Sequence, residues 1–133
     1  MPPFSHRLRV RYHECDAQGI VFNANHFAYV DVALTELWRE AFGSYATLLE
    51  HGVDMVVAEA TAAFLAPTRF DDEVDIVLAV QHVGTTSLVT ATETRRGDSV
   101  LVRGSIRHVC VNPATFAKTP FPDDVSTVLA GYG

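Results

Sequence analysis

The chain has 133 residues, 48% of them hydrophobic and 20% charged, and ten Lys and Arg against sixteen Asp and Glu give a formal charge of −6. This composition is that of a globular domain, and the acidic balance supplies no general attraction for nucleic-acid phosphates or an anionic membrane. The length predicts one domain over residues 1–133. No apolar run approaches the roughly 20 residues of a membrane span, so we expect a cytoplasmic protein without nucleic-acid or membrane partners.

The first predicted element is a strand over residues 6–14. Leu8, Val10 and Tyr12 alternate there with arginines, which is the period of a half-buried strand. A polar stretch, "HECDAQGIVFNANHFAYVD", follows and leads into the next element.

A helix of nearly five turns is predicted after that stretch. Apolar residues recur at three- and four-residue intervals from Phe27 to Ala41, and Gly43 is a plausible C-terminal stop. Residues 44–52 then suit a connection or a short helix.

The rest of the chain predicts an antiparallel meander. "VDMVVAEATAAFLAP" reads as a long strand ended by Pro67, although its alanines leave a helix open. Three segments rich in Val, Ile, Leu or Thr follow, separated by Gly84 and by Gly97-Asp98: "DEVDIVLAVQHVG", "SLVTATETRRG" and "SVLVRGSIRHVCVN". The tail "NPATFAKTPFPDD" looks irregular, and we expect the domain to end there. One helix and about five strands predict an α+β layer in which a curved antiparallel sheet crosses the helix.

Cysteines and histidines give little sign of a metal or redox centre. Cys15 and Cys110 are expected to be reduced thiols, and Cys110, within a strand pattern, suits a small core residue. The six histidines show no paired metal-ligand spacing. We therefore predict no metal and no cofactor.

The polar stretch before the helix is the candidate site. Asp16 lies in a loop where a carboxylate can face a ligand, although an ordinary turn or cap would also account for it. Gly19 permits a sharp turn with positive φ, and Asn23 and Asn25 are good N-cap residues. Free N–H groups and the positive end of the helix dipole suit a developing oxyanion, so an acid and an anion-stabilising group are expected within one short loop.

The segment "YHECDAQGIVFNANHFAYVDVALTELWRE" resembles the signature of the 4-hydroxybenzoyl-CoA thioesterase family, which has the hotdog fold. Its D-x-x-G-[IV]-[VI] core is carried by Asp16, Gly19, Ile20 and Val21. The similarity continues in order through "FLAPTRFDDEVDIVLAV", "GTTSLV" and "HVCVNPATFAKTPFP", so it covers roughly residues 6–122.

The resemblance implies a hotdog acyl-CoA thioesterase that hydrolyses a thioester to a free carboxylic acid and coenzyme A. It implies a homodimer or homotetramer in which the sheets of two protomers run together, with the active site between subunits. Asp16 would be the catalytic carboxylate, as nucleophile or as general base for water. The backbone amide of Asn23 would hold the thioester oxygen, and His26 would donate to the thioester or orient Asp16.

Binding residues are expected from the same family pattern. Gly19 and Val21 belong to the motif, and Thr61 would contact the acyl group. Coenzyme A would be approached by the "GTTS" and "FAKTPFP" segments, which carry Thr86, Ser87 and Lys118.

Three alternatives stay open at this point. Cys15 could act as the nucleophile, but no base is paired with it, and in an extended loop its side chain would diverge from that of Asp16. An enoyl-thioester hydratase would need an Asp-and-His arrangement that is not evident here. A non-catalytic acyl-CoA-binding protein would use the same groove without cleaving the thioester.

Overall fold

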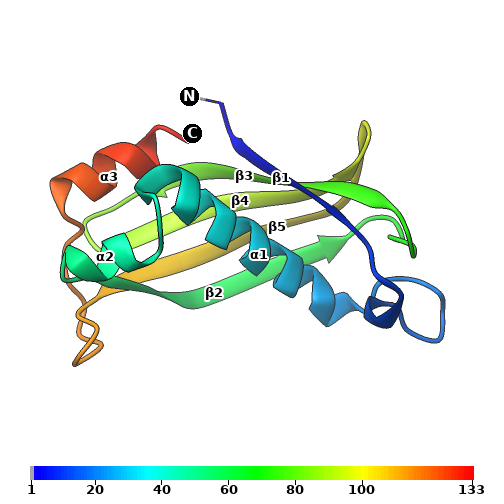
Figure 1. The fold of residues 1–133 in the computed structure, drawn as a ribbon, viewed down its shortest axis with the longest axis horizontal. Helices are drawn as coiled ribbons and strands as arrows, with labels where there is room; N and C mark the ends of the chain where they lie inside the picture. The colour runs from blue at the N-terminus through cyan, green and yellow to red at the C-terminus, as the bar shows by residue number, and fades with distance from the viewer. Residues whose placement is uncertain (1) are drawn as a thin grey trace.

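A curved sheet of five antiparallel strands lies against one long helix in the computed structural model, which describes residues 2–133 (Figure 1). The sheet order is β1-β3-β4-β5-β2, so β1 and β2 form its two edges. The strands are β1 (Phe4–Arg9), β2 (Asp54–Phe64), β3 (Glu73–Val83), β4 (Ser87–Arg96) and β5 (Ser99–Val111), and the helices are α1 (Asn23–Phe42), α2 (Ala46–Glu50) and α3 (Asp123–Ala130). The predicted α+β hotdog fold is confirmed.

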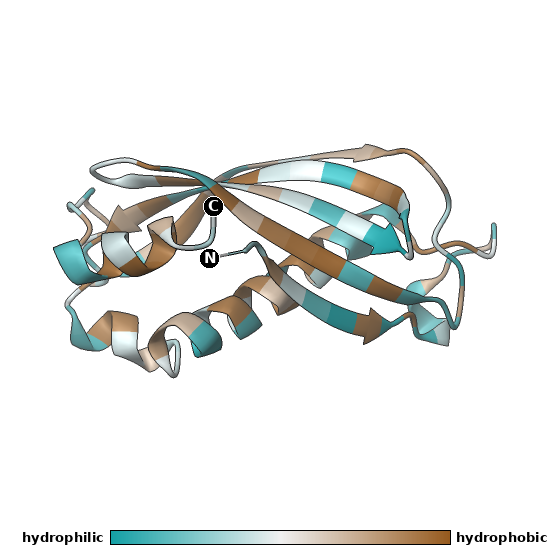
Figure 2. Ribbon diagram, turned by 90° about the horizontal axis from the view of Figure 1, so that it is seen from above, coloured by the Kyte–Doolittle hydropathy of each residue, from teal (hydrophilic) through white to brown (hydrophobic). Residues whose placement is uncertain are grey.

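The core lies between α1 and the concave side of the sheet, and α3 covers the same side (Figure 2). From α1, Leu34 and Leu37 are buried against Ile76 and Leu78 of β3 in one cluster. Fully burying a Leu or Ile side chain stabilises the fold by about 1.5–3 kcal/mol. The apolar residues whose periodicity predicted α1 therefore form the face that packs on the sheet. Gly43, with φ of 83°, ends the helix as expected.

The first strand is shorter than predicted, because the chain leaves the sheet after Arg9. Residues Tyr12–Glu14 form a single 3₁₀ turn, closed by the Glu14 carboxylate accepting the Arg11 N–H at 2.7 Å. The alternation therefore fails at its end: Tyr12 is 79% exposed, whereas Glu14 is buried.

Two further expectations are wrong, one about the start of α1 and one about the end of the domain. The N-cap of α1 is Phe22, without a side-chain capping bond, and Asn25 donates instead from its side chain to the Glu14 carbonyl oxygen at 2.8 Å. The domain does not end in the irregular tail, since α3 follows it and buries Val125 and Leu129 in the core. Only eight residues long, α3 offers little periodicity to recognise.

A β-bulge in β2 decides which of its side chains face α1. Met55 and Val57 lie opposite Cys110 and His108 of β5, but after the shift between Val57 and Glu59 the pairing continues with Ala60 opposite Ile106 and Phe64 opposite Val102. The helix-facing set thus changes from odd to even numbers, because one extra residue reverses the alternation of faces. Glu59 and Thr61 consequently belong to the outer face.

None of the helices within residues 2–133 combines the length and apolar character that crossing a membrane requires.

Candidate active site

Asp16 stands at the base of a tight loop that joins the 3₁₀ turn to α1. The Asp16 N–H donates to the Ile20 carbonyl oxygen and the Gly19 N–H donates to the Asp16 carbonyl oxygen, both at 2.9 Å. Gly19 has φ of +77°, a conformation that other residues rarely adopt, so the predicted need for glycine is confirmed. One carboxylate oxygen of Asp16 accepts the Gln18 N–H at 2.9 Å, which orients the side chain.

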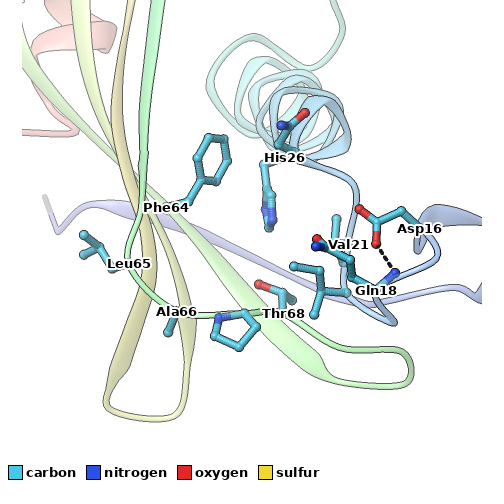
Figure 3. Close-up of a pocket in the computed structure, with 11 residues that line it drawn as sticks. Asp16, Gln18, Val21, His26, Phe64, Leu65, Ala66 and Thr68 are labelled. Atoms are coloured by element: carbon cyan, nitrogen blue, oxygen red, sulfur yellow. Dashed lines mark hydrogen bonds between the residues drawn. The ribbon is translucent and has the colours of Figure 1, made fainter.

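This loop and the segment that follows β2 enclose a cavity of about 380 Å³ (Figure 3). The two segments are joined where the Val21 N–H donates to the Thr68 carbonyl oxygen at 2.8 Å. Both the carboxylate and the helix entrance therefore border one hollow, whose lining is Asp16, Gln18, Ile20, Val21, Asn23, His26 and residues 64–68.

The first turn of α1, which begins beside this cavity, has free backbone donors. Within residues 2–133, the amides of Phe22 and Asn25 bond to the carbonyl oxygens of Glu14 and Phe22, but no acceptor is found for those of Asn23 and Ala24. Such orphan N–H groups carry the positive end of the helix dipole. Because Asn23 also lines the cavity, its amide is available to an oxygen atom of a ligand.

His26 projects from α1 into the cavity between Phe64 and Asp16 (Figure 3). His26 is 5% exposed, and its ring lies 5.6 Å from the ring of Phe64 and 5.8 Å from that of Tyr29, centroid to centroid. Burial lowers the pKa of His26, so the imidazole is neutral near pH 7. Its Nδ1 has no partner among the described residues, which leaves a buried polar atom for a ligand to satisfy.

Sequence reasoning missed the wall formed by residues 64–68. Phe64 reaches the cavity because of the β2 bulge, and Thr68 brings a buried hydroxyl that has no partner within residues 2–133. The segment "FLAPTRFDD" carried the family similarity, but nothing in its pattern showed that it folds back onto the Asp16 loop.

Other predicted site residues lie elsewhere in the protomer. Gly19 shapes the loop without lining the cavity, and Thr61 is exposed on the outer face of β2. Thr86 and Ser87 lie at the β3–β4 turn and Lys118 in the loop after β5, at the end of the sheet opposite the Asp16 loop (Figure 1). The protomer alone therefore does not bring the predicted coenzyme A residues to Asp16.

Cys15 is poorly placed and poorly activated. The backbone of Cys15 is extended and forms an antiparallel bridge with Val21, and Cys15 does not line the cavity. Burial raises the pKa of its thiol, as do the neighbouring carboxylates of Asp16 and Glu14. The thiolate that a nucleophile requires is thus disfavoured. Cys110 is fully buried in the core.

No group of three or more His, Cys, Asp or Glu side chains within residues 2–133 is arranged to hold a metal ion.

Comparisons with known proteins agree on the family. The family model of the thioesterase superfamily matches residues 18–109. The acyl-CoA thioester hydrolase YbgC of Escherichia coli O157:H7 is 29% identical over 119 residues, covering 89% of each chain. Among solved structures, a hypothetical protein from Aquifex aeolicus superposes with a TM-score of 0.89 at 26% identity, covering 96% of this chain and 99% of the other. A gentisyl-coenzyme A thioesterase, BH1999, gives a TM-score of 0.84 at 28% identity, with 95% and 99% covered.

Proposed function

Because the chain belongs to the thioesterase superfamily, we propose that it hydrolyses an acyl-coenzyme A thioester to a carboxylic acid and free coenzyme A at the cavity beside Asp16. The observation that carries this proposal is the meeting of a carboxylate and a free helix-start amide around one hollow. Hydrolysis of an acyl group needs both an oxygen nucleophile and a donor for the oxyanion. The name of the relative YbgC supports the same reaction.

Asp16 supplies the carboxylate for the attack. One of its oxygens is held by Gln18, and in Figure 3 the side chain points toward the cavity. It either takes a proton from water that adds to the thioester carbon, or adds to that carbon itself and forms an anhydride that water then opens. Either route consumes one water and releases coenzyme A as the thiol.

The Asn23 amide and His26 serve the thioester oxygen. As negative charge develops there, the Asn23 N–H donates to it, aided by the helix dipole. His26 is a neutral hydrogen-bonding group rather than a charged acid, because burial lowers its pKa. The unpartnered hydroxyl of Thr68 adds a further polar contact for the ligand.

A homodimer built through β2 completes the coenzyme A site. β2 is an edge strand along which Val57 and Phe64 are 54% and 50% exposed. Pairing two such edges in antiparallel fashion about a two-fold axis places the β5 end of one protomer beside the Phe64 end of the other. Lys118 of one copy, with Thr86 and Ser87 behind it, would then approach the cavity of the other.

A thiol-release assay over acyl-CoA esters with short aliphatic and hydroxylated aromatic acyl groups tests the reaction. Asp16→Asn and Asp16→Ala are expected to lower kcat by about 10²–10⁴, the usual contribution of a positioned acid or base. Asp98→Asn is the control, since this exposed aspartate lies in the β4–β5 turn. A folded Asp16→Ala protein with wild-type kcat would exclude the carboxylate role, and ligand binding without turnover by the wild type would favour a binding protein.

Mixing two defective variants tests the shared site. Asp16→Asn and Lys118→Glu proteins, unfolded together and refolded, form heterodimers with one intact site each. Equal mixing is expected to recover about a quarter of wild-type kcat/KM, because half of the dimers carry one of two sites. No recovery from two variants that each dimerise would show that Lys118 does not act across the interface.

A further inference from the structure

Behind the Asp16 loop lies a buried acid that the proposed reaction does not use. Glu14 ends the 3₁₀ turn, and its side chain is 10% exposed. A buried carboxylate is costly unless its oxygens are bonded, and here both oxygens are. One accepts the Arg11 N–H at 2.7 Å and the Tyr29 hydroxyl at 2.8 Å, and the other accepts the Arg11 guanidinium at 2.7 and 3.0 Å.

The backbone of Glu14 holds the far end of the same loop. Its carbonyl oxygen accepts the Phe22 N–H at 3.0 Å and the Asn25 side-chain N–H at 2.8 Å. Asn25 and Tyr29 are four residues apart, so they lie on one face of α1, and Glu14 bonds to both. A single residue therefore ties the start of the loop to its end and to the first two turns of α1.

The charge of this cluster is fixed near pH 7. Burial alone would raise the pKa of Glu14, but the bonds from Arg11 and Tyr29 outweigh it and hold the pKa below its usual value. Burial and the Glu14 carboxylate raise the pKa of Tyr29, so its hydroxyl remains a donor. Bonds to an ionised acceptor are stronger and shorter than neutral ones, which suits a rigid support.

We propose that Glu14 is a positioning residue that fixes the Asp16 carboxylate relative to the Asn23 amide. Asp16 lies two residues after Glu14, and Asn23 lies between Phe22 and Asn25, which both donate to the Glu14 carbonyl oxygen. Displacing a reacting group by about 1 Å can cost about 10² in rate. The catalytic part of this proposal rests on the proposed hydrolysis, whereas the locking of the loop does not.

Glu14→Gln is the sharpest test, because the glutamine amide keeps the shape but turns one acceptor into a donor. Either the guanidinium of Arg11 or the pair formed by the Arg11 N–H and the Tyr29 hydroxyl then loses its acceptor. Glu93→Gln is the matched control, since Glu93 on β4 is also a partly buried carboxylate, paired with Arg95 and Arg103. Tyr29→Phe removes one donor only, and it tests the same lock should Glu14→Gln fail to fold.

Two measurements separate positioning from a general loss of structure. Hydrogen exchange is expected to be about tenfold faster in residues 15–23 of Glu14→Gln and unchanged in β4. At a temperature where circular dichroism shows a fully folded protein, kcat is expected to fall by about 10² while KM changes by less than about twofold. Glu93→Gln should change neither quantity.

The outcomes are distinct. Unchanged exchange of the loop, or a wild-type kcat in a folded protein whose loop exchanges faster, would overturn the positioning role. If the wild type released no thiol from any ester, the proposed hydrolysis would fail. Faster exchange in Glu14→Gln would then still support the loop lock, and unchanged exchange would still overturn it.

Discussion

Replacing Gly104 with alanine should loosen the edge strand that walls the cavity. An added Cβ would lie 2.1 Å from the carbonyl oxygen of Thr61, whereas real Cβ contacts essentially never fall below 3.0 Å. The obstacle is the backbone of β2, so the strand itself must move away from β5 by roughly 1 Å. Overpacking of this kind costs about 1–3 kcal/mol. Weakening one or two ladder hydrogen bonds adds about 1 kcal/mol each. We therefore expect a loss of about 3 kcal/mol in the free energy of unfolding.

Thermal and urea denaturation measure this loss. For a chain of this size, about 3 kcal/mol corresponds to a melting temperature lowered by roughly 10 °C. Gly97→Ala is the control, because its Cβ meets nothing within 4 Å and only its positive φ opposes the change. That strain is worth about 1 kcal/mol. Should Gly104→Ala melt no lower than Gly97→Ala, the close approach of β2 and β5 would not be the constraint inferred here.

Three further predictions concern the core, the thiol and a surface pair. Leu37→Ala, at a fully buried position of α1, should lower the free energy of unfolding by about 2–5 kcal/mol, against less than about 0.5 kcal/mol for the exposed Val32→Ala, as measured in urea. Cys15→Ala should keep kcat within about twofold of wild type in the thiol-release assay, and a loss comparable to that of Asp16→Ala would restore the thiol mechanism. Bonds to the Thr47 carbonyl and to Asp124 raise the pKa of His51. The stability that these bonds give the folded protein is therefore complete below the pKa of His51 in the unfolded chain, and it disappears as pH rises through the pKa of His51 in the folded protein. The melting temperature of wild type should thus exceed that of His51→Gln at about pH 5.5 and converge with it near about pH 8.5; a constant difference would contradict this.

The sequence was most informative where a residue type has a single structural use. Gly19 was recognised because only glycine readily takes the positive φ of that loop, and α1 because its apolar face repeats over 20 residues. The position of Asp16 on a cavity followed from the same loop. These features depend on neighbours in the chain, which the sequence displays.

What the sequence did not show depends on contacts between distant segments. The role of Glu14 as a buried acceptor needs Tyr29 and Asn25 to face it, and the alternation of residues 6–14 suggested instead that the strand continued. Thr61 was expected at the acyl group from the family pattern, whereas in the structure it lies with Glu59 on the outer face of β2. The bulge in β2 carries no Gly or Pro that would announce it, and it reverses those two faces.

That bulge also bears on how such a site can diverge. The loss of one codon, that for Ala58, would remove the bulge and restore a regular ladder in which every remaining pair is unchanged. Val57 would stay opposite His108 and Phe64 opposite Val102, so the apolar wall of the hollow would keep its orientation, and Glu59 and Thr61 would stay on the outer face. A lineage can therefore lose a residue at this one point without rebuilding the site, so a different ligand preference has to arise from substitutions in the lining, while the carboxylate in the loop before α1 stays where it is.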